Sequence, residues 1–347
     1  MVTLKDVATL AGVSPTTASA ALRGLDIVKP ETTAKVRQAA SDLNYRVNAS
    51  AKMLRSGQSG IFTLAVPELT TPFYATLADC MSEEVESHGY RLIIRKTRFS
   101  AQTERHVLSE LSTTFSDGIF IIVTQLSTQQ VKDLLGQRPA VLFEDFSMDG
   151  LFDSVNTPGA DGIITAISHL KDCGRTSIGV IGGMPDAELA LQPGAGLTAR
   201  ARLHRLDAAK RALRAMELDD RAGFMQADWS VAGGIAAAHA LVEQGMPYDG
   251  LCCMNDDLAL GLLRGFHECG VAVPDQVAVI GFDGIPQGSW SVPTLSTIAV
   301  DFDGAARSAL QLMLRHCNNP DAPAFCQRIT IGHQLIPRES TVGTYRH

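Results

Sequence analysis

The chain has 347 residues with a formal net charge of −7, 45% hydrophobic residues and 19% charged residues. This composition is that of a globular protein and excludes a disordered tail or a fibre, and no apolar run approaches the roughly 20 residues that a membrane-spanning helix needs. The seven cysteines form no C-x-x-C pair, which speaks against a disulfide framework and a cysteine zinc site, and the N-terminus has no basic and apolar leader, so we expect a cytoplasmic protein.

Charge is unevenly distributed along the chain. Residues 1–60 contain eight basic and four acidic side chains, so this segment is positive while the chain as a whole is negative. A basic head on an acidic body is typical of a nucleic-acid-binding module joined to a globular core. A chance asymmetry of the surface is the alternative interpretation.

Residues 1–46 predict a head of three short helices. Thr3 and Asp6 form a capping-box-like start to the first helix, and Ser14 followed by Pro15 begins the second. The third begins near the next proline and has an apolar inner face. Three short helices at this spacing make a small all-α helix-turn-helix head, whose second helix enters the major groove of DNA.

Residues 47–60 follow the head as a short basic stretch that ends in Gly and Ser residues. One interpretation is a flexible tether. The other is a hinge helix that folds on DNA and inserts Leu54 as an apolar wedge in the minor groove.

Beyond the linker, apolar strand patterns alternate with amphipathic helix patterns. The predicted strands are 61–66, 91–94, 118–123, 140–143, 177–181, 223–226, 250–254 and 277–282, and a strand-like segment spans 328–336. The predicted helices are 72–88, 101–115, 128–135, 160–173, 206–216, 231–244, 256–269 and 301–315.

This alternation predicts an α/β core with parallel sheets covered by helices on both faces. Two successive series indicate two doubly wound parallel-sheet lobes, not one wide sheet. We expect a core over residues 61–347, with a first lobe of about 61–157 and 299–316 and a second lobe of about 158–298 and 317–340. Such lobes bind ligands beyond the carboxyl ends of their strands, in the cleft between them.

Motifs from nearly the whole chain carry a family resemblance. They are Thr3-Leu4-Lys5-Asp6-Val7-Ala8, Ala11-Gly12-Val13-Ser14, Thr17-Ala18-Ser19, Leu43-Asn44-Tyr45, Thr71-Pro72-Phe73-Tyr74, Asp117-Gly118-Ile119, Asn255-Asp256, Val279-Ile280-Gly281-Phe282-Asp283 and Pro293-Thr294-Leu295-Ser296-Thr297-Ile298. Together they resemble the lactose/galactose-repressor (LacI/GalR) family of bacterial transcription regulators. The resemblance implies a core of the periplasmic-binding-protein type, in a homodimer that binds double-stranded, pseudo-palindromic operator DNA and a small effector, often a sugar.

The resemblance also implies which residues of the head contact DNA. Ala20 stands where the family very often has arginine, and without a guanidinium no bidentate contact with guanine is possible from there. The operator is therefore expected to depart from the usual family sequence, with Arg23 taking over some contact. Pro15 and Thr16 would face base edges. Phosphate contacts would come from Ser14, Thr17, Ser19 and Asn48, the alternative for the hydroxyl residues being helix capping or plain solvation. The implied DNA-binding residues are Leu4, Ser14, Pro15, Thr16, Thr17, Ser19, Ala20, Arg23, Asn48, Ala51 and Leu54.

For the cleft, the resemblance implies an effector site. Asp283 would accept hydrogen bonds from sugar hydroxyls, and an exposed Trp229 indole would cover the apolar face of a pyranose while its N–H donates a hydrogen bond. Asn255 matches the family's Asn-Asp pair, in which Asp256 is expected to cap the following helix. The implied effector-binding residues are Phe73, Tyr74, Glu144, Asp145, Arg205, Trp229, Asn255 and Asp283.

Several of these assignments leave alternatives open. Arg205 matches the family's cleft arginine, but Arg200 and Arg202 are close rivals for that role. One of Phe73 and Tyr74 can instead belong to the core. Either Glu144 or Asp145, which follow the fourth predicted strand, can contact the ligand. The segment 183–199, which is rich in Pro, Gly and Ala, is either a lid over the cleft or a loose loop.

An enzyme and an exported sugar-binding protein are the competing functions. The sequence has no HExxH, GxSxG or P-loop pattern and no GxGxxG after a strand, so we expect no catalytic residue, no cofactor and no metal site. An exported binding protein would share the two-lobed core but would have no use for a basic head.

The expected mechanism is a clamp on DNA that lobe closure controls. Effector binding would change the angle between the first lobes of a dimer and thereby the spacing of the hinge helices. With no heptad tail after the last strand, we expect dimers and not tail-linked tetramers. Inducer and co-repressor stay equally open as roles for the effector.

Overall fold

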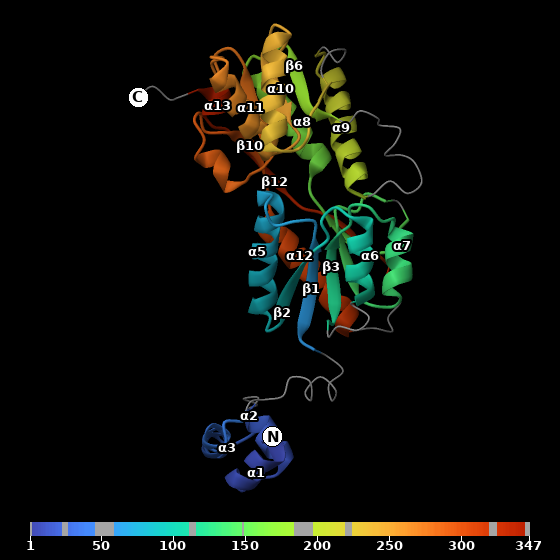
Figure 1. Cartoon of the computed structure of the whole chain (residues 1–347), viewed down its shortest axis with the longest axis vertical. Helices are drawn as coiled ribbons and strands as arrows, with labels where there is room; N and C mark the ends of the chain where they lie inside the picture. Colours follow the sequence, from blue (N-terminus) through green and yellow to red (C-terminus); the bar gives the residue numbers. More distant parts are fainter. Residues whose placement is uncertain are drawn as a thin grey trace. The chain divides into compact units, whose positions relative to one another are not determined.

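The computed structural model describes residues 2–22, 27–45, 59–110, 116–147, 149–183, 197–218, 224–318 and 325–343. The chain divides into two compact units, one ending at Ser59 and one beginning at Gly60 (Figure 1). No helix within the described ranges is long and apolar enough to cross a membrane.

The first unit contains helices α1 (Leu4–Ala11), α2 (Pro15–Leu22) and α3 (Pro30–Asp42). They match the three helices predicted for the head. Small side chains let these short helices cross closely, so the core of the unit is built largely from alanine and valine. The buried residues of this core are Val7, Ala8, Ala18, Ala21, Val36, Ala39 and Ala40.

Both predicted helix caps in the head are confirmed. The Thr3 hydroxyl accepts a hydrogen bond from the Asp6 amide at 3.4 Å, and the Asp6 carboxylate accepts one from the Thr3 amide at 2.8 Å. The Ser14 hydroxyl accepts a hydrogen bond from the Thr17 amide at 3.0 Å. These bonds satisfy backbone N–H groups that have no partner inside the helix.

The first lobe of the second unit is a parallel sheet with helices on both faces. Helices α5 (Pro72–Ser87) and α12 (Phe302–Asn318) cover one face, and α6 (Ala101–Glu110) and α7 (Thr128–Leu135) cover the other (Figure 1). The strand order is β11 (Arg328–Thr330), β5 (Asp153–Asn156), β4 (Ala140–Phe143), β3 (Gly118–Ile122), β1 (Ile61–Val66) and β2 (Arg91–Lys96).

The second lobe repeats this arrangement. Helices α8 (Gly159–Asp172) and α9 (Leu197–Ala215) cover one face of its sheet, and α10 (Val231–Glu243) and α11 (Asp256–Glu268) cover the other. The terminal helix α13 (Glu339–Val342) follows β12, which pairs antiparallel with β10, while the other pairings are parallel. The strand order is β12 (His333–Ile336), β10 (Ser296–Val300), β9 (Ala278–Asp283), β8 (Gly250–Cys253), β6 (Ile178–Gly183) and β7 (Phe224–Gln226).

Side chains that alternate in direction along each strand supply apolar groups to the cores on both faces of the sheet. In β8, Leu251 and Cys253 join the core on the α10 and α11 side, whereas Cys252 joins the core on the α8 and α9 side. Successive side chains of a strand point to opposite faces, so a fully apolar strand can be covered on both sides. The fold class predicted from the sequence, two α/β lobes with mainly parallel sheets, is confirmed.

The chain passes between the lobes three times: after β5, after β10 and after β11. The predicted second-lobe segment 317–340 is therefore wrong in its first part. β11 pairs with β5 in the first lobe through Arg328 opposite Ser154, and only β12 belongs to the second lobe. A continuous extended pattern over 328–336 does not reveal the break at Gly332, which separates the two strands.

The strand β5 of the first lobe was not predicted, because its sequence is polar. β5 reads Asp-Ser-Val-Asn and is buried along its whole length. The Asp153 carboxylate accepts hydrogen bonds from Arg315 Nη2 at 2.6 Å and from His316 Nε2 at 2.7 Å, both from α12. Paired charges thus replace the apolar side chains that mark an ordinary buried strand.

Candidate functional site

A cavity of about 390 Å³ lies between the two lobes. Its walls come mainly from the carboxyl ends of the strands and the helix starts that follow them, where ligands of open α/β sheets bind. Every predicted effector residue except Asp145 lines it. The lining residues are Glu68, Thr71, Phe73, Tyr74, Phe99, Ile122, Glu144, Arg205, Asp228, Trp229, Ser230, Asn255 and Asp283.

Asp283 ends β9 and carries the most strongly perturbed carboxyl of the cavity. Burial raises its pKa well above the ordinary value, and the Arg205 guanidinium, whose Nη1 lies 3.9 Å from Oδ1, opposes that rise. Its side chain is 7% exposed, and no hydrogen bond from the described residues reaches its carboxyl group. A buried acceptor without a hydrogen bond favours a ligand that brings donors.

Arg205 is held in place by the protein itself. Its Nη1 donates to the Met254 carbonyl at 2.7 Å and its Nη2 donates to the Thr157 hydroxyl at 3.3 Å. The guanidinium carbon also lies 4.0 Å from the centre of the Phe282 ring. The structure thus places the preferred arginine in the cavity, while the side chains of its rivals Arg200 and Arg202 lie outside the described part.

Trp229 lines the cavity, but the predicted role of its N–H is wrong. The indole Nε1 donates to the Gly182 carbonyl at 2.8 Å, so it is already engaged within the second lobe. The ring is half-buried and has the Arg205 guanidinium 5.4 Å from its centre. The ring face, not the N–H, is what this tryptophan offers a ligand.

The helix cap expected of Asp256 is supplied by Asn255 instead. Asn255 is the cap of α11, because its Oδ1 accepts from the Leu258 amide at 3.0 Å, and it also lines the cavity. Asp256, predicted to be the cap, is fully buried instead. Its Oδ2 accepts from the Gly284 and Ile285 amides at 2.8 and 2.9 Å, and its Oδ1 accepts from the Thr297 hydroxyl at 2.7 Å.

Asp256 therefore organises the turn that follows Asp283. Burial raises the pKa of Asp256 to about 7, against the effect of its three hydrogen-bond donors. Asp283 itself has a φ of 119°, a region that residues other than glycine rarely adopt, so the turn needs support. A Cβ at Gly281 would lie 2.0 Å from Asp256 Oδ1, which explains why glycine stands there.

The first-lobe wall is aromatic. Phe73 and Tyr74, both in the first turn of α5, meet edge to face with ring centres 5.4 Å apart, and Tyr74 meets Phe99 at 6.2 Å. Both residues left open between core and cavity are half-buried and line the cavity. Their rings offer the apolar surface that suits the C–H face of a sugar.

The two acids after β4 differ in position. Glu144 lines the cavity and accepts hydrogen bonds from the Thr157 amide at 2.5 Å and the Thr157 hydroxyl at 3.0 Å. Asp145 is 1% exposed, accepts from the Ser147 amide at 2.8 Å and does not line the cavity, so its predicted ligand contact is wrong. Consecutive side chains after a strand leave in different directions, and only one of them reaches the ligand space.

Six lining residues were not among the predicted ones. Most of them follow strands of both lobes, such as Glu68 after β1 and Asp228 after β7. Their position at the carboxyl end of a predicted strand is therefore the feature by which the sequence could have identified them. Of these positions, only Thr71 stands in one of the motifs of the resemblance. The additional residues are Glu68, Thr71, Phe99, Ile122, Asp228 and Ser230. Residues 184–196, which make up most of the predicted lid or loop, lie outside the described residues.

The head presents its second helix with the polar residues at its start exposed. Ser14, Pro15 and Thr16 are exposed, and Thr17 is half-buried. Ala20 is only 4% exposed, so this predicted DNA contact is contradicted: its methyl group faces the protein. Leu4 and Ser19 are half-buried, and the predicted contacts Arg23, Asn48, Ala51 and Leu54 lie outside the described residues.

Comparison with known proteins agrees with both units. Residues 167–341 match the periplasmic binding protein-like domain, and residues 3–48 match the lacI family of bacterial regulatory proteins. The chain is 26% identical to the HTH-type transcriptional repressor PurR of Vibrio atlanticus over 99% of both sequences. It is 29% identical to the ribose operon repressor of Escherichia coli over 98% of this chain and 100% of that protein.

The fold matches that of the Lac repressor dimer bound to operator and the anti-inducer ONPF. The TM-score is 0.83 at 24% identity, with 98% of this chain and 99% of that chain covered. The relatives named above are transcriptional repressors, not enzymes. The chain therefore belongs to the lacI family of bacterial regulatory proteins and is a DNA-binding transcription regulator with a periplasmic binding protein-like core.

Proposed function

We propose that this regulator is a homodimeric repressor whose hold on a pseudo-palindromic operator is controlled by an uncharged sugar bound between the lobes. One observation carries the effector class: buried carboxyl and amide oxygens lie beside aromatic faces in a cavity of about 390 Å³. Carboxylates accept hydrogen bonds from pairs of sugar hydroxyls, and aromatic rings cover the apolar face of the ring. A volume of this size suits a small ligand.

The charge of the cavity favours a neutral effector over a phosphorylated one. Four carboxyl groups line the described part of the cavity, namely Glu68, Glu144, Asp228 and Asp283. Arg205 is the cation among the described lining residues, and its Nη atoms already donate to Met254 and Thr157. An anionic ligand would meet like charges, whereas hydroxyl groups supply the donors that Asp283 lacks.

One relative supports a sugar, because it is named as the repressor of a ribose operon. The Lac repressor, whose fold matches, is bound to operator as a dimer, which supports the homodimer and the operator. The proposed DNA-reading residues of this chain are those at the exposed start of α2, with the hinge leucine Leu54 as wedge. Acting on operator DNA, the protein would work in the cytoplasm, associated with the nucleoid.

A thermal-shift screen of the purified full chain tests the effector class. We expect D-ribose, lactose or another neutral sugar to raise the unfolding midpoint, because a ligand at a hundred times its Kd stabilises the folded state by about 2.7 kcal/mol. Ribose 5-phosphate and adenosine serve as matched anionic and nucleoside probes. Stabilisation by the phosphate or the nucleoside, with none by neutral sugars, would overturn the effector class and leave the family unchanged.

Selection of binding sites from random duplex DNA tests the operator. We expect a pseudo-palindrome whose half-sites lie about one helical turn apart. Leu54→Ala should weaken binding to the selected site while leaving the sugar-induced thermal shift intact. If no sequence is selected, the protein would be a sugar-binding protein without a regulatory DNA role.

A further inference from the structure

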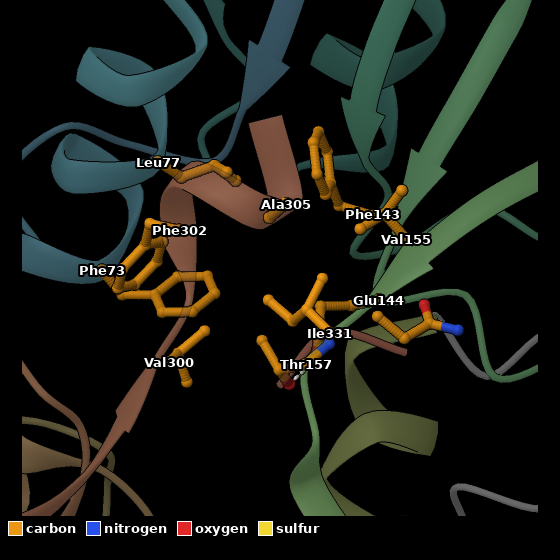
Figure 2. Close-up of a pocket in the computed structure, with 11 residues that line it drawn as sticks. Phe73, Leu77, Phe143, Glu144, Val155, Thr157, Val300, Phe302, Ala305 and Ile331 are labelled. Atoms are coloured by element: carbon orange, nitrogen blue, oxygen red, sulfur yellow. Dashed lines mark hydrogen bonds between the residues drawn. The ribbon is translucent and has the colours of Figure 1, made fainter. Parts of the chain in front are cut away.

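A second, much smaller cavity lies at the junction of the two lobes. Its volume is about 10 Å³, room for a single water molecule or methyl group. Figure 2 shows Leu77 and Phe302 on one side of it, facing Phe143 and Val155 on the other. These side chains come from α5, α12, β4 and β5, so the cavity is a gap in the packing of the first lobe at its junction with the second.

All three connections between the lobes contribute to its wall. Thr157 follows β5, Val300 ends β10 and Ile331 follows β11, and each of them lines the small cavity. Protein interiors are otherwise packed as densely as organic crystals. A change in the angle between the lobes must move these three connections, and the gap supplies the space in which neighbouring side chains can follow.

Phe73 and Glu144 line both this cavity and the effector cavity. The Phe73 ring meets the Phe302 ring edge to face, with centres 5.3 Å apart, where α12 begins. Glu144 accepts hydrogen bonds from the amide and the hydroxyl of Thr157 in the first connection. One face of this two-residue wall thus meets the ligand, and the other meets the connections.

A buried polar atom beside the gap points to a second packing arrangement. Asn156 lines the small cavity, and its Nδ2 donates to the Asp145 carbonyl at 3.2 Å. Its buried Oδ1 accepts no hydrogen bond from the described part of the chain. An unsatisfied buried acceptor costs about 1–3 kcal/mol, so an arrangement of the junction that supplies a donor gains that amount.

We propose that Phe73 and Glu144 form a wall that transmits effector occupancy to the three connections between the lobes, with the small cavity as the space into which the wall moves. This inference rests on the proposed function, in which an effector occupies the larger cavity. Phe73 and Glu144 are then positioning residues for the regulatory response as well as ligand contacts. Filling the small cavity separates the two roles, because it blocks the movement and leaves the ligand side of the wall unchanged.

The first experiment needs no effector. Val155→Ile adds one methylene group to β5 at the small cavity, and Val141→Ile adds the same group to β4, where the residue is fully buried and does not line the cavity. Hydrogen exchange is measured over residues 153–158, 296–302 and 328–333. We expect exchange there to slow about threefold or more in Val155→Ile and not to slow in Val141→Ile, where no space exists and the added group overpacks the core. Equal exchange in both variants would overturn the proposal.

The second experiment measures the response. With whichever of D-ribose and lactose stabilises the protein more, we expect Val155→Ile to keep the sugar Kd within about threefold of wild type. The sugar-driven change in operator affinity should fall at least fivefold. An undiminished response would overturn the proposal, and Val300→Ile, which fills the cavity from another connection, replaces Val155→Ile if that variant fails to fold. If neither sugar binds, the effector class fails, while the hydrogen-exchange comparison still decides on the wall.

Discussion

The two walls of the effector cavity are built differently. In the second lobe, the polar groups of Arg205, Trp229 and Asn255 are each bonded to the backbone of their own lobe, at Met254, Gly182 and Leu258. In the first lobe, the rings of Phe73 and Tyr74 contact each other edge to face, and Tyr74 contacts Phe99 in the same way. Phe99 is 42% exposed. The second-lobe groups are thus fixed by hydrogen bonds before a ligand arrives, whereas the first lobe offers aromatic rings that contact one another edge to face.

This difference separates two contributions to binding. Groups fixed in advance lose little conformational freedom when the ligand binds, so they give orientation and specificity. Aromatic rings give contact area that tolerates small changes of ligand shape. Substitutions should therefore cost most in the second lobe and least at the exposed edge of the first. The predictions below test that order.

The largest effect is expected at Asp283. Asp283→Asn should lower sugar affinity by about 10- to 100-fold, because it replaces one acceptor oxygen by an NH2 group and a buried sugar hydroxyl left without its acceptor costs about 1–3 kcal/mol. Operator affinity without sugar should stay unchanged. Titration of tryptophan fluorescence measures the sugar affinity. Asp145→Asn is the matched control, since that carboxyl is also buried after a strand but does not line the cavity. Equal losses in the two variants would contradict the assignment.

A smaller loss, combined with a change in pH dependence, is expected at Asp256. Burial raises its pKa in the folded state to about 7, so its contribution to stability is fully present below the ordinary carboxyl pKa and is lost as the pH rises through 7. Urea unfolding between pH 5 and 8 should show a stability that declines less steeply in Asp256→Asn, by up to about 1.4 kcal/mol per pH unit. Sugar affinity should fall several-fold because the turn after Asp283 loosens. An unchanged pH dependence would show that Asp256 keeps its ordinary pKa.

Trp229→Phe tests whether the indole N–H serves the protein or the ligand. Phenylalanine keeps an aromatic face but removes the bond to the Gly182 carbonyl. We expect a loss of about 1 kcal/mol in the free energy of unfolding, the usual value of one hydrogen bond, and less than a fivefold loss of sugar affinity. A tenfold or greater loss of sugar affinity at unchanged stability would show that the indole N–H donates its hydrogen bond to the ligand.

The smallest effect is expected at the exposed edge of the aromatic wall. Phe99→Leu should weaken sugar binding by about two- to threefold, because the leucine still covers part of the same surface. Phe325→Leu is the control, since this ring is 94% exposed and does not line the cavity. A loss at Phe99 as large as that at Asp283 would show that the first-lobe wall also supplies most of the affinity.

The sequence predicted the architecture well because the buried strands are apolar and separated by helical repeats. It failed at β5, whose Asp153 is neutralised by Arg315 and His316 from a helix about 160 residues later in the chain. It also missed the break at Gly332, since an extended run carries no mark of which sheet it joins. Such features depend on partners that are distant in the chain, and local patterns carry no information about them.

At the candidate site, the sequence predicted which segments converge but not which atoms are free. The motif residues Arg205, Asn255 and Asp283 do line one cavity. The engagement of the Trp229 N–H follows from a hydrogen bond to the end of β6, and the role of Asp256 follows from hydrogen bonds to the turn after β9. A motif gives the type of a side chain, whereas burial and hydrogen bonding decide what that side chain still offers a ligand.

Because the chain passes between the two lobes three times, part of the first lobe is synthesised after most of the second. The first lobe needs α12 (Phe302–Asn318) and β11 (Arg328–Thr330), which leave the ribosome only after nearly all of the second lobe has been made. The early part of the first lobe ends at Asn156, so one of its faces stays only partly covered for about 160 further residues, until α12 ends, and its sheet edge stays open for about 170, until β11 begins. At about 5–20 residues per second this wait lasts roughly 8 to 35 seconds, and it is when a nascent chain of this regulator most needs protection from aggregation.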